Sequence, residues 1–414
     1  FLFRHRGSAA MMPPPPPSLS FGGDSDDEDG GDTLGSMPAP GLDLTSTFNK
    51  ADMDQFMLSQ SGAFKVSDFQ IRPEGGLTTV GNQSSPEHAR PAELSFENET
   101  QKLEVQSITD LEMKEELGAG ASGTVVKAKH HSSGTLVAVK CVTILEKAKR
   151  DQIVKELRIM MSHTHGARWL VTMHNAFYEE AKVYTVLEYM DGGSMEDLVK
   201  KHAAVGGLRD EHALAKIAKE LLNGLNYLHR QLHQVHRDLK PANVMLNSQG
   251  AVKISDFGIS SQLESTGALC ETFVGTTCYM SPERLQGDAY SYPADIWAFG
   301  LIVLELASGA YPYPMPDSYF QLLGHIMDKP APSLPAGADF SAAFGEFVSL
   351  CLDKSPQKRV SAHDLLKHPW FREAQSPLRA DAGARYDERP LNLERSRDVA
   401  GLLDGVDGMR LNDR

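Results

Sequence analysis

Apolar and polar residues alternate along the first globular part of this chain of 414 residues. From Leu111 to His131 the alternation surrounds a glycine cluster, which predicts a hairpin of two strands. Gly134 then turns the chain into a third predicted strand, Leu136 to Val142. A helix of mixed charge is expected from about Leu145 to Met161. This part of the chain therefore begins as a small β-rich unit.

The region that follows is predicted to be mainly helical. One further strand is expected at Val183 to Leu187. Apolar residues then recur at the i, i+3, i+4 spacing of a buried helical stripe, namely Leu214, Ile217, Leu221, Leu225 and Leu228. Residues Ile296 to Leu306 are apolar almost all round, which predicts a helix at the centre of the domain. Strands first and helices later indicate an α+β fold with a small β-rich lobe and a larger helical lobe.

Residues 1–105 differ in composition and are expected to be a mostly disordered N-terminal region. Pro13 to Pro17 favour polyproline II, and the acidic run Asp24 to Asp29 lies among glycines, so neither stretch can bury enough apolar surface to fold. Residues 46–72 are an exception, because apolar residues recur there among polar ones. We expect this segment to dock onto the folded domain or onto a partner. Residues from 73 to about 105 return to a linker composition, and 372–414 form a tail with no sign of a second domain.

Composition narrows the range of partners and compartments. The formal net charge of −14 and the absence of a basic face argue against a nucleic-acid binder. The four cysteines are widely spaced and form neither a disulfide framework nor a zinc motif, which indicates a reducing compartment. No apolar run approaches the length of a membrane span, and the first residues lack the apolar core of a secretory signal. We expect a cytoplasmic protein without membrane insertion, with the nucleus also open.

Candidate chemistry is concentrated in the segment Val235 to Asn243. Asp238 can accept a proton from a hydroxyl nucleophile, Lys240 can neutralise charge on a phosphate, and Asn243 can bind a metal ion through its carbonyl oxygen. Asp256, shortly afterwards, supplies a second metal ligand. Phosphoryl transfer depends mostly on positioning and electrostatics, and these residues supply both. A charged surface turn is the alternative, but it would not require this order and spacing.

A glycine-rich loop lies between the first two predicted strands. Its residues are Gly118, Ala119, Gly120, Ala121, Ser122 and Gly123. Glycine lets the backbone approach a polyphosphate closely, although this short motif is weak when it stands alone. The loop precedes a strand rather than opening a helix, which disfavours a Rossmann dinucleotide site. Lys140 lies in the apolar strand that follows, and a buried lysine requires a charged partner. Glu156 on the next helix is the expected partner, with a nucleotide phosphate as the second.

Residues from about 108 to 371 resemble a eukaryotic protein kinase domain, on the strength of the segments just described and of Asp256-Phe257-Gly258. Within that superfamily the chain resembles the MAP kinase kinases, above all in the long run Phe273 to Gly287. Met190 to Ser194 and Asp256 to Ser260 fit the same family, while Asp295 to Gly300 fits the helical lobe of the kinase domain. The resemblance implies a bilobal kinase fold, with Glu283 and Arg359 forming a buried ion pair in the helical lobe.

The resemblance also implies an ATP site between the lobes. Its apolar walls would be Leu117, Val125, Ala138 and Met245, with Leu187 at the back and backbone groups of Glu188 and Met190 bonding the adenine. Lys140 would hold the α- and β-phosphates, and Asn243 and Asp256 would bind Mg²⁺. Asp238 would orient the attacking hydroxyl, and Thr276 would brace Asp238 and Lys240.

The implied activity is dual-specificity phosphorylation of threonine and tyrosine in the activation loop of a MAP kinase. An upstream MAP kinase kinase kinase would control it by phosphorylating Thr266 and Thr272, whose spacing is typical of plant-type members, with Ser265 as the substitute site. Phosphate there would pair with Arg237. A serine/threonine kinase outside this group and a kinase-shaped scaffold without activity remain as alternatives. No clear docking motif is present near the N-terminus, although Arg385 and Arg389 offer a weak one in the tail.

Overall fold

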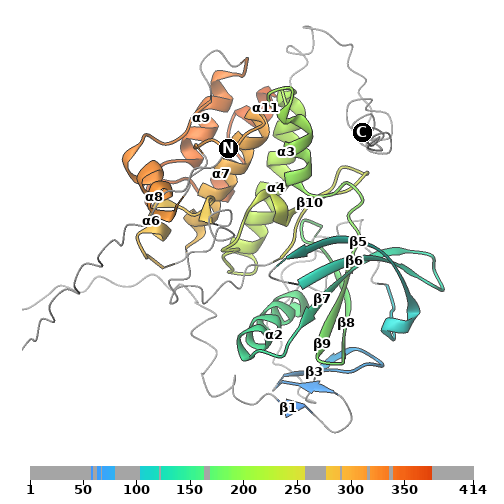
Figure 1. Ribbon diagram of the computed structural model, residues 1–414. Helices are drawn as coiled ribbons and strands as arrows, with labels where there is room; N and C mark the ends of the chain where they lie inside the picture. Colours follow the sequence, from blue (N-terminus) through green and yellow to red (C-terminus); the bar gives the residue numbers. More distant parts are fainter. Residues whose placement is uncertain are drawn as a thin grey trace, which may run out of the picture. The chain divides into compact units, whose positions relative to one another are not determined.

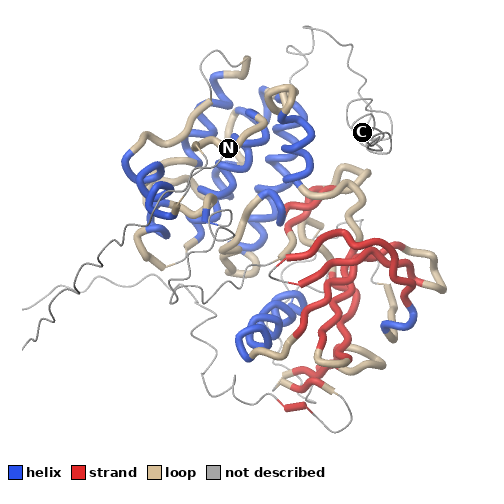
Figure 2. Tube along the Cα trace, viewed as in Figure 1, coloured by secondary structure: helices blue, strands red, loops and turns tan. Residues whose placement is uncertain are grey.

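The computed structural model describes residues 57–58, 63–66, 68–79, 103–120, 123–162, 168–256, 277–289, 291–314, 318–334 and 339–374. Strands gather in one lobe and helices in the other (Figures 1 and 2). The predicted bilobal α+β fold is therefore confirmed. The predicted N-terminal tail before residue 57 and the C-terminal tail after residue 374 lie outside the described residues.

The N-lobe is built on a five-stranded antiparallel sheet of order β5-β6-β7-β9-β8. Its strands are β5 (Leu111–Gly120), β6 (Gly123–His130), β7 (Leu136–Thr143), β8 (Met173–Glu179) and β9 (Lys182–Glu188). The expected hairpin is β5 with β6, and the turn before β7 contains Gly134, whose φ of 73° favours glycine. The sequence pattern did not predict β8, which pairs along β9 at the edge of the sheet.

Helix α2 (Lys147–Ser162) lies beside this sheet (Figure 1). It begins two residues later than the sequence pattern predicted. Ile153, Leu157 and Met160 recur at helical spacing and are buried, at 2%, 0% and 6% exposure. Their burial fixes which face of α2 is turned to the lobe interior, and Glu156 lies beside them on the same helix.

A second, small sheet precedes the two lobes in the chain. Its strands are β1 (Met57–Leu58), β2 (Phe64–Lys65), β3 (Phe69–Ile71) and β4 (Leu77–Thr79), paired antiparallel in that order. Phe64, Phe69 and Ile71 are fully buried, and β3 and β4 contact β8. The segment expected to dock therefore packs on the N-lobe.

The predicted linker boundary at residue 73 is wrong. Gly75, with a φ of 75°, turns the chain back into β4, and Gly75 N–H donates to the Gln106 carbonyl. Val105 is 1% exposed in the core on the other side of the sheet, with Phe177 and Val186. Composition failed here because a few buried apolar side chains, attached to an existing sheet, fix a segment that is otherwise polar.

The C-lobe is helical, with a short β-hairpin facing the N-lobe. Its helices are α3 (Met195–Ala203), α4 (Glu211–Arg230), α6 (Pro282–Leu285), α7 (Tyr292–Ser308), α8 (Tyr319–Asp328), α9 (Ala342–Cys351), α10 (Ala362–Leu365) and α11 (Trp370–Glu373). The hairpin is β10 (Val244–Leu246) with β11 (Val252–Ile254), and a short 3₁₀ turn at Pro241–Asn243 leads into it. A second 3₁₀ turn, Ile108–Asp110, lies in the other lobe and leads into β5. Helix α7 is buried on all sides around Trp297, as its apolar sequence predicted. Among the described helices, none combines the length and apolar character needed to cross a bilayer.

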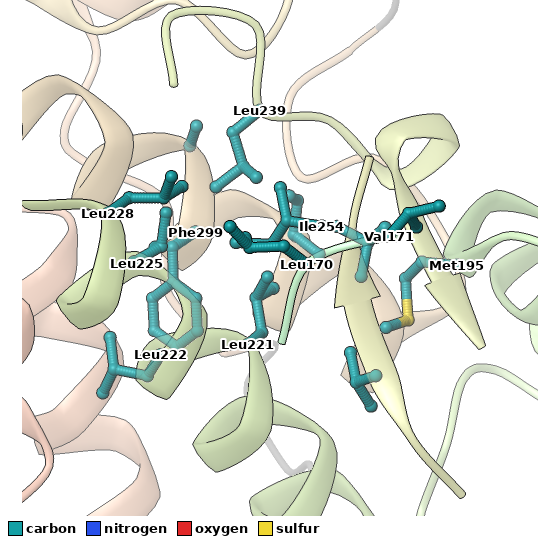
Figure 3. Close-up of a cluster of buried hydrophobic side chains, with 14 of the residues drawn as sticks. Leu170, Val171, Met195, Leu221, Leu222, Leu225, Leu228, Leu239, Ile254 and Phe299 are labelled. Carbon is teal, nitrogen blue, oxygen red and sulfur yellow. The ribbon is translucent and has the colours of Figure 1, made fainter. Parts of the chain in front are cut away.

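One apolar cluster joins the two lobes to the segment Val235 to Asn243, which carries the candidate chemistry (Figure 3). Leu170 pairs as an isolated β-bridge with Ile254 of β11, and Leu221 and Leu225 of α4 lie beside them. Leu239, from the loop after α4, points into the same cluster and is 3% exposed. Lys240 and Asp238 are its direct neighbours in the chain, so this core fixes where both lie.

The expected ion pair between Glu283 and Arg359 is present. Arg359 donates from Nη1 to Oε1 at 2.7 Å and from Nη2 to Oε2 at 3.0 Å, with both side chains at most 6% exposed. Burial raises the pKa of Glu283, but the hydrogen-bonded guanidinium of Arg359 outweighs it and brings the pKa below its ordinary value. The pair ties α6 to the segment before α10.

Glu283→Gln is expected to lower the free energy of unfolding by about 3 kcal/mol at pH 7, because it leaves a buried guanidinium without its counter-charge. A lowered pKa in the folded state stabilises the protein above the unfolded pKa, and this contribution is lost as the pH falls through the folded pKa. The penalty should therefore shrink below about pH 4.5. Urea unfolding at pH 7 and pH 4 measures both effects, and an equal penalty at the two pH values would contradict the assignment.

Candidate active site

The glycine-rich loop is the turn of the β5–β6 hairpin, where Gly118 pairs with Val125 and Gly120 with Gly123. Gly123 is required by the fold, because its φ is 119° and a Cβ there would overlap the Cys141 carbonyl oxygen. Gly118 and Gly120 are different. A Cβ at either position would meet no atom within 4 Å. Packing within the described residues therefore does not explain these two glycines, whereas close approach of a ligand to the backbone does.

Lys140 of β7 lies between two carboxylates. Its Nζ donates to Glu156 Oε1 on α2 at 2.7 Å and to Asp256 Oδ1, after β11, at 2.6 Å. Lys140 and Glu156 are 4% and 6% exposed. Glu156 is the predicted partner, and Asp256 is an additional one that joins the N-lobe to the C-lobe. An ammonium has three donors, so one remains for a ligand phosphate.

The charge state of this group follows from its surroundings. Burial lowers the pKa of Lys140, yet the carboxylates of Glu156 and Asp256 more than compensate and raise the pKa above its ordinary value. Burial raises the pKa of Glu156, while Lys140 opposes that shift and Asp256 adds to it. Burial and the attraction between opposite charges therefore act against each other in this group, and at Lys140 the attraction is the stronger effect.

The segment Val235 to Asn243 is anchored to the helical core by Asp295 of α7, a residue that is 2% exposed. Its carboxylate accepts from the backbone N–H groups of His236 at 2.7 Å and Arg237 at 3.1 Å. His229 Nε2 lies 2.8 Å from the same carboxylate and donates to it, since a carboxylate only accepts. Arg237 has a φ of 73°, which is strained for a residue with a side chain, and these bonds support that conformation.

Asp238, Lys240 and Asn243 come together on this loop. Lys240 Nζ donates to Asp238 Oδ2 at 2.8 Å, and Asn243 Nδ2 donates to the same oxygen at 3.2 Å and to the Asp238 carbonyl at 2.8 Å. Both side-chain bonds use Oδ2. Within the part of the chain that the structure describes, no hydrogen bond uses Asp238 Oδ1, which leaves that oxygen to accept from a substrate hydroxyl.

Asp256 reaches the same place through backbone pairing. Ser255 N–H donates to the Asn243 carbonyl at 2.9 Å, and His236 Nε2 donates to the Ser255 carbonyl at 3.1 Å. Asp256 itself has a φ of 49°. Asn243 and Asp256 are separated in the chain by the whole β10–β11 hairpin, and they are thereby neighbours in space, as the predicted metal site requires.

The segment after β9 connects the lobes. The Glu188 carboxylate accepts from Lys253 Nζ of β11 at 2.7 Å, so recognition of a ligand falls to backbone groups here. Met190 is 5% exposed, and no hydrogen bond among the described residues uses its N–H. Ala138 and Leu187 are buried in the N-lobe strands β7 and β9. Met245 of β10, in the C-lobe, is partly buried against the same apolar core.

Leu117 and Val125 lie on β5 and β6 and are more exposed. Leu117 is 45% exposed and Val125 is half-buried, whereas Ala138 and Leu187 are each 9% exposed. Three of the predicted wall residues thus lie on N-lobe strands and Met245 lies on β10 of the C-lobe, and Leu117 on β5 is the most exposed of the four. Ala119 lies in β5, but Ala121 and Ser122 fall outside the described residues, as do Ser265, Thr266, Thr272 and Thr276.

Residues 111–371 match the protein kinase domain family. The chain is 39% identical over 321 residues to mitogen-activated protein kinase kinase 2 of Arabidopsis thaliana, covering 76% of this chain and 84% of that protein. The chain belongs to the MAP kinase kinases. Tobacco mitogen-activated protein kinase kinase SIPKK is 37% identical over 322 residues, covering 76% of this chain and 85% of that protein. The Drosophila melanogaster dual specificity mitogen-activated protein kinase kinase dSOR1 is 37% identical over 306 residues, covering 68% and 75%. These alignments are longer than the kinase domain, so the similarity continues beyond it.

As a protein kinase, this MAP kinase kinase uses ATP and a divalent metal ion. The described residues fit both. The amide nitrogen of Asn243 is committed to Asp238, which turns its carbonyl oxygen to the acceptor role that a metal needs. Asp256 supplies a carboxylate whose side chain is 40% exposed. No cluster of three His, Cys, Asp or Glu occurs in the described ranges, so phosphate and water oxygens would complete the coordination.

Sequence reasoning missed two parts of this site in the kinase. It placed Asp295 in the helical lobe without a role, and it did not single out Lys253. Neither position has a local signal, because both act on residues far away in sequence, Asp295 on His236 and Lys253 on Glu188. The one usable sign is a charged residue in an otherwise apolar element, since Asp295 opens the buried part of α7.

Gly120→Ala and Gly123→Ala are expected to separate ligand binding from folding. Gly120→Ala should leave the free energy of unfolding within about 0.5 kcal/mol of wild type, because Cβ meets open space, but weaken ATP binding about 10-fold or more. Gly123→Ala should destabilise the protein by about 2 kcal/mol, because of its φ and the Cys141 carbonyl. Urea unfolding and nucleotide titration measure the two quantities. Equal losses of stability would contradict a ligand-specific role for Gly120.

Proposed function

We propose that this protein transfers the γ-phosphoryl group of ATP, with Mg²⁺, to the threonine and tyrosine hydroxyls in the activation loop of a MAP kinase. The supporting observation is the Lys140 ammonium bound at once to Glu156 and Asp256, 2.7 Å and 2.6 Å away. A scaffold would gain nothing from this arrangement, because burying the charges of Lys140 and Glu156 is costly unless the pair organises a further charge. Membership of the MAP kinase kinases supports the substrate.

Nucleotide binding is assigned to the loop from Gly118 to Gly123, to Lys140 and to the segment between the lobes. The unused N–H of Met190 donates to the adenine, and the Glu188 carbonyl accepts from it. Leu117, Val125, Ala138 and Met245 cover its two faces. The third donor of Lys140 binds the α- and β-phosphates, while Glu156 keeps the ammonium from rotating away.

Asp238 acts on the substrate. Oδ1 accepts the hydrogen bond of the attacking hydroxyl and takes its proton as the oxygen bonds to the γ-phosphorus. The bond between the γ-phosphorus and the bridging oxygen breaks, and ADP leaves with the electron pair. Lys240, bonded to Asp238 Oδ2, orients the carboxylate and places a positive charge beside the transferring group. Asn243 Oδ1 and Asp256 Oδ2 would hold Mg²⁺, which supplies charge neutralisation on the phosphates when bound.

Regulation is assigned to Thr266 and Thr272, with Ser265 as the substitute. Two cations among the described residues support this assignment, because Arg237 lies close enough to Lys155 of α2 to influence its pKa. Burial lowers the pKa of Lys155, Asp151 opposes that shift, and Arg237 adds to it. A phosphate from an upstream MAP kinase kinase kinase would relieve the repulsion between these cations and order the loop.

The cytoplasm, and the nucleus as a second site, are proposed as the location. Cys141, Cys278 and Cys351 are free thiols, and burial raises the pKa of the Cys278 and Cys351 thiols. Among the described residues no disulfide thus joins these cysteines, which supports a reducing compartment.

Asp238→Asn is expected to reduce phosphorylation of a MAP kinase about 100-fold or more, since the amide cannot take the proton. ATP binding should change little, because Asp238 contacts the hydroxyl rather than the nucleotide. Phosphate incorporation across a panel of MAP kinases, with separate detection of phosphothreonine and phosphotyrosine, measures the effect. Asp364→Asn, in an exposed C-lobe pair with Lys367, is the control. Transfer only to unrelated proteins would refute the substrate, and no transfer by protein carrying glutamate at Thr266 and Thr272 would favour the scaffold.

Replacing Thr266 and Thr272 by alanine should abolish activation by an upstream kinase, while glutamate at both positions should raise basal activity. The readout is MAP kinase phosphorylation before and after incubation with the upstream kinase and ATP. Ser265→Ala alone is the comparison. Unchanged activation in the double alanine variant, with loss in Ser265→Ala, would move the assignment to Ser265.

A further inference from the structure

Helix α2 is held on two sides. Glu156 and Arg158 are two residues apart, and because an α-helix advances about 100° per residue, their side chains leave it in nearly opposite directions. Glu156 bonds Lys140 of β7. Arg158 bonds Asp68, in the turn before β3 of the small N-terminal sheet. The helix that carries Glu156 is thus connected to a segment outside the kinase domain.

The Asp68–Arg158 contact has the fork geometry of a strong ion pair. Arg158 Nε donates to Asp68 Oδ2 at 2.9 Å, and Nη2 donates to Oδ1 at 2.7 Å. Two parallel bonds fix orientation as well as distance. The Arg158 side chain is only 13% exposed, whereas that of Asp68 is 48% exposed. Asp68 can therefore be replaced without disturbing a core.

Asp68 is itself held in place by the small sheet. Val66 N–H donates to the Phe69 carbonyl at 2.8 Å and closes the turn that presents Asp68. Phe69 is fully buried, and the Phe64 ring lies 5.7 Å from the ring of Tyr178 on β8. The turn is consequently fixed to the edge of the large sheet.

Asn175 of β8 provides a second attachment. Its Oδ1 accepts from Leu77 N–H of β4 at 3.0 Å, and its Nδ2 donates to the Val105 carbonyl at 2.8 Å. A Cβ at Gly76 would overlap the Asn175 side chain, so β4 can approach this closely only with glycine there. The small sheet is thus attached to β8 by side-chain hydrogen bonds as well as by apolar burial. Its position on the N-lobe therefore does not depend on the contact with α2.

We propose that Asp68 is a positioning residue for phosphoryl transfer: through Arg158 it keeps α2 where Glu156 reaches Lys140. The inference rests on the proposed kinase activity. Without the pair, α2 loses this attachment on the side away from Glu156, and states in which Glu156 leaves Lys140 become more populated. Lys140 would then be directed by Asp256 alone, and the phosphates would be held in a less productive position.

The expected effect is moderate because Asp68 is half exposed. Asp68→Asn should lower kcat about 3-fold to 10-fold, the range of an ion pair partly screened by water. KM for ATP should stay within about 2-fold, because adenine contacts are unchanged. Amide hydrogen exchange in residues 147–162 should become faster, while exchange in α7 should not.

The test is a double-mutant cycle of Asp68→Asn, Arg158→Gln and the double variant, assayed for kcat, KM and exchange. The double variant should lose no more than the worse single variant, because each change removes the same interaction. Glu112→Gln, which removes an N-lobe pair with Lys114 that does not involve α2, is the matched control.

Additive losses, or an equal loss of kcat in Glu112→Gln, would overturn the proposal. So would a fall in kcat with unchanged exchange in α2. If protein carrying glutamate at Thr266 and Thr272 phosphorylates no MAP kinase, the proposed function is refuted instead, and hydrogen exchange would still report whether Asp68 restrains α2.

Discussion

The Lys140 ammonium is buried where β7, helix α2 and the segment after β11 meet, and it is bonded to a carboxylate from each of the latter two. A buried charge of this kind is stable only if its partners stay close, so the ammonium constrains three elements at once. Lys140 brings Glu156 into the N-lobe core and brings Asp256 of the C-lobe to the same point. The proposed nucleotide site of this MAP kinase kinase depends on that constraint, because the third donor of Lys140 is the one that we assign to the phosphates.

The other half of the site is fixed by the helical core. Asp295, buried in α7, accepts two backbone N–H groups of the catalytic loop, while Leu239 points into the apolar cluster shown in Figure 3. The loop thus has a polar attachment just before Asp238, at His236 and Arg237, and an apolar attachment just after it, at Leu239. Such an attachment allows a loop to keep side chains within the small tolerance that phosphoryl transfer requires, although loops are ordinarily more mobile than helices.

Sequence patterns were most successful where the same residues serve both local structure and chemistry. The β5–β6 hairpin and the stripe of α4 follow from the periodicity of their apolar residues. Helix α7 follows from a run that is apolar almost all round. The pattern failed in the N-terminal segment, where β1 to β4 form a sheet that composition had assigned in part to linker. Its strands are two or three residues long, too short to carry a periodic signal, and they become stable only by packing on β8.

The sequence by itself determined the chemistry, since Asp238, Lys240, Asn243 and Asp256 have an order and spacing that suits phosphoryl transfer. It also determined the family, through residues that lie close together in the chain. The tertiary structure decided which partner each charged side chain meets across a long separation: Lys140 meets Asp256, Glu188 meets Lys253, Asp295 meets the backbone N–H of His236, and Asp68 meets Arg158. The physical reason is that partner choice for a charge depends on distance and burial in three dimensions, and neither is encoded in the local pattern of apolar and polar residues.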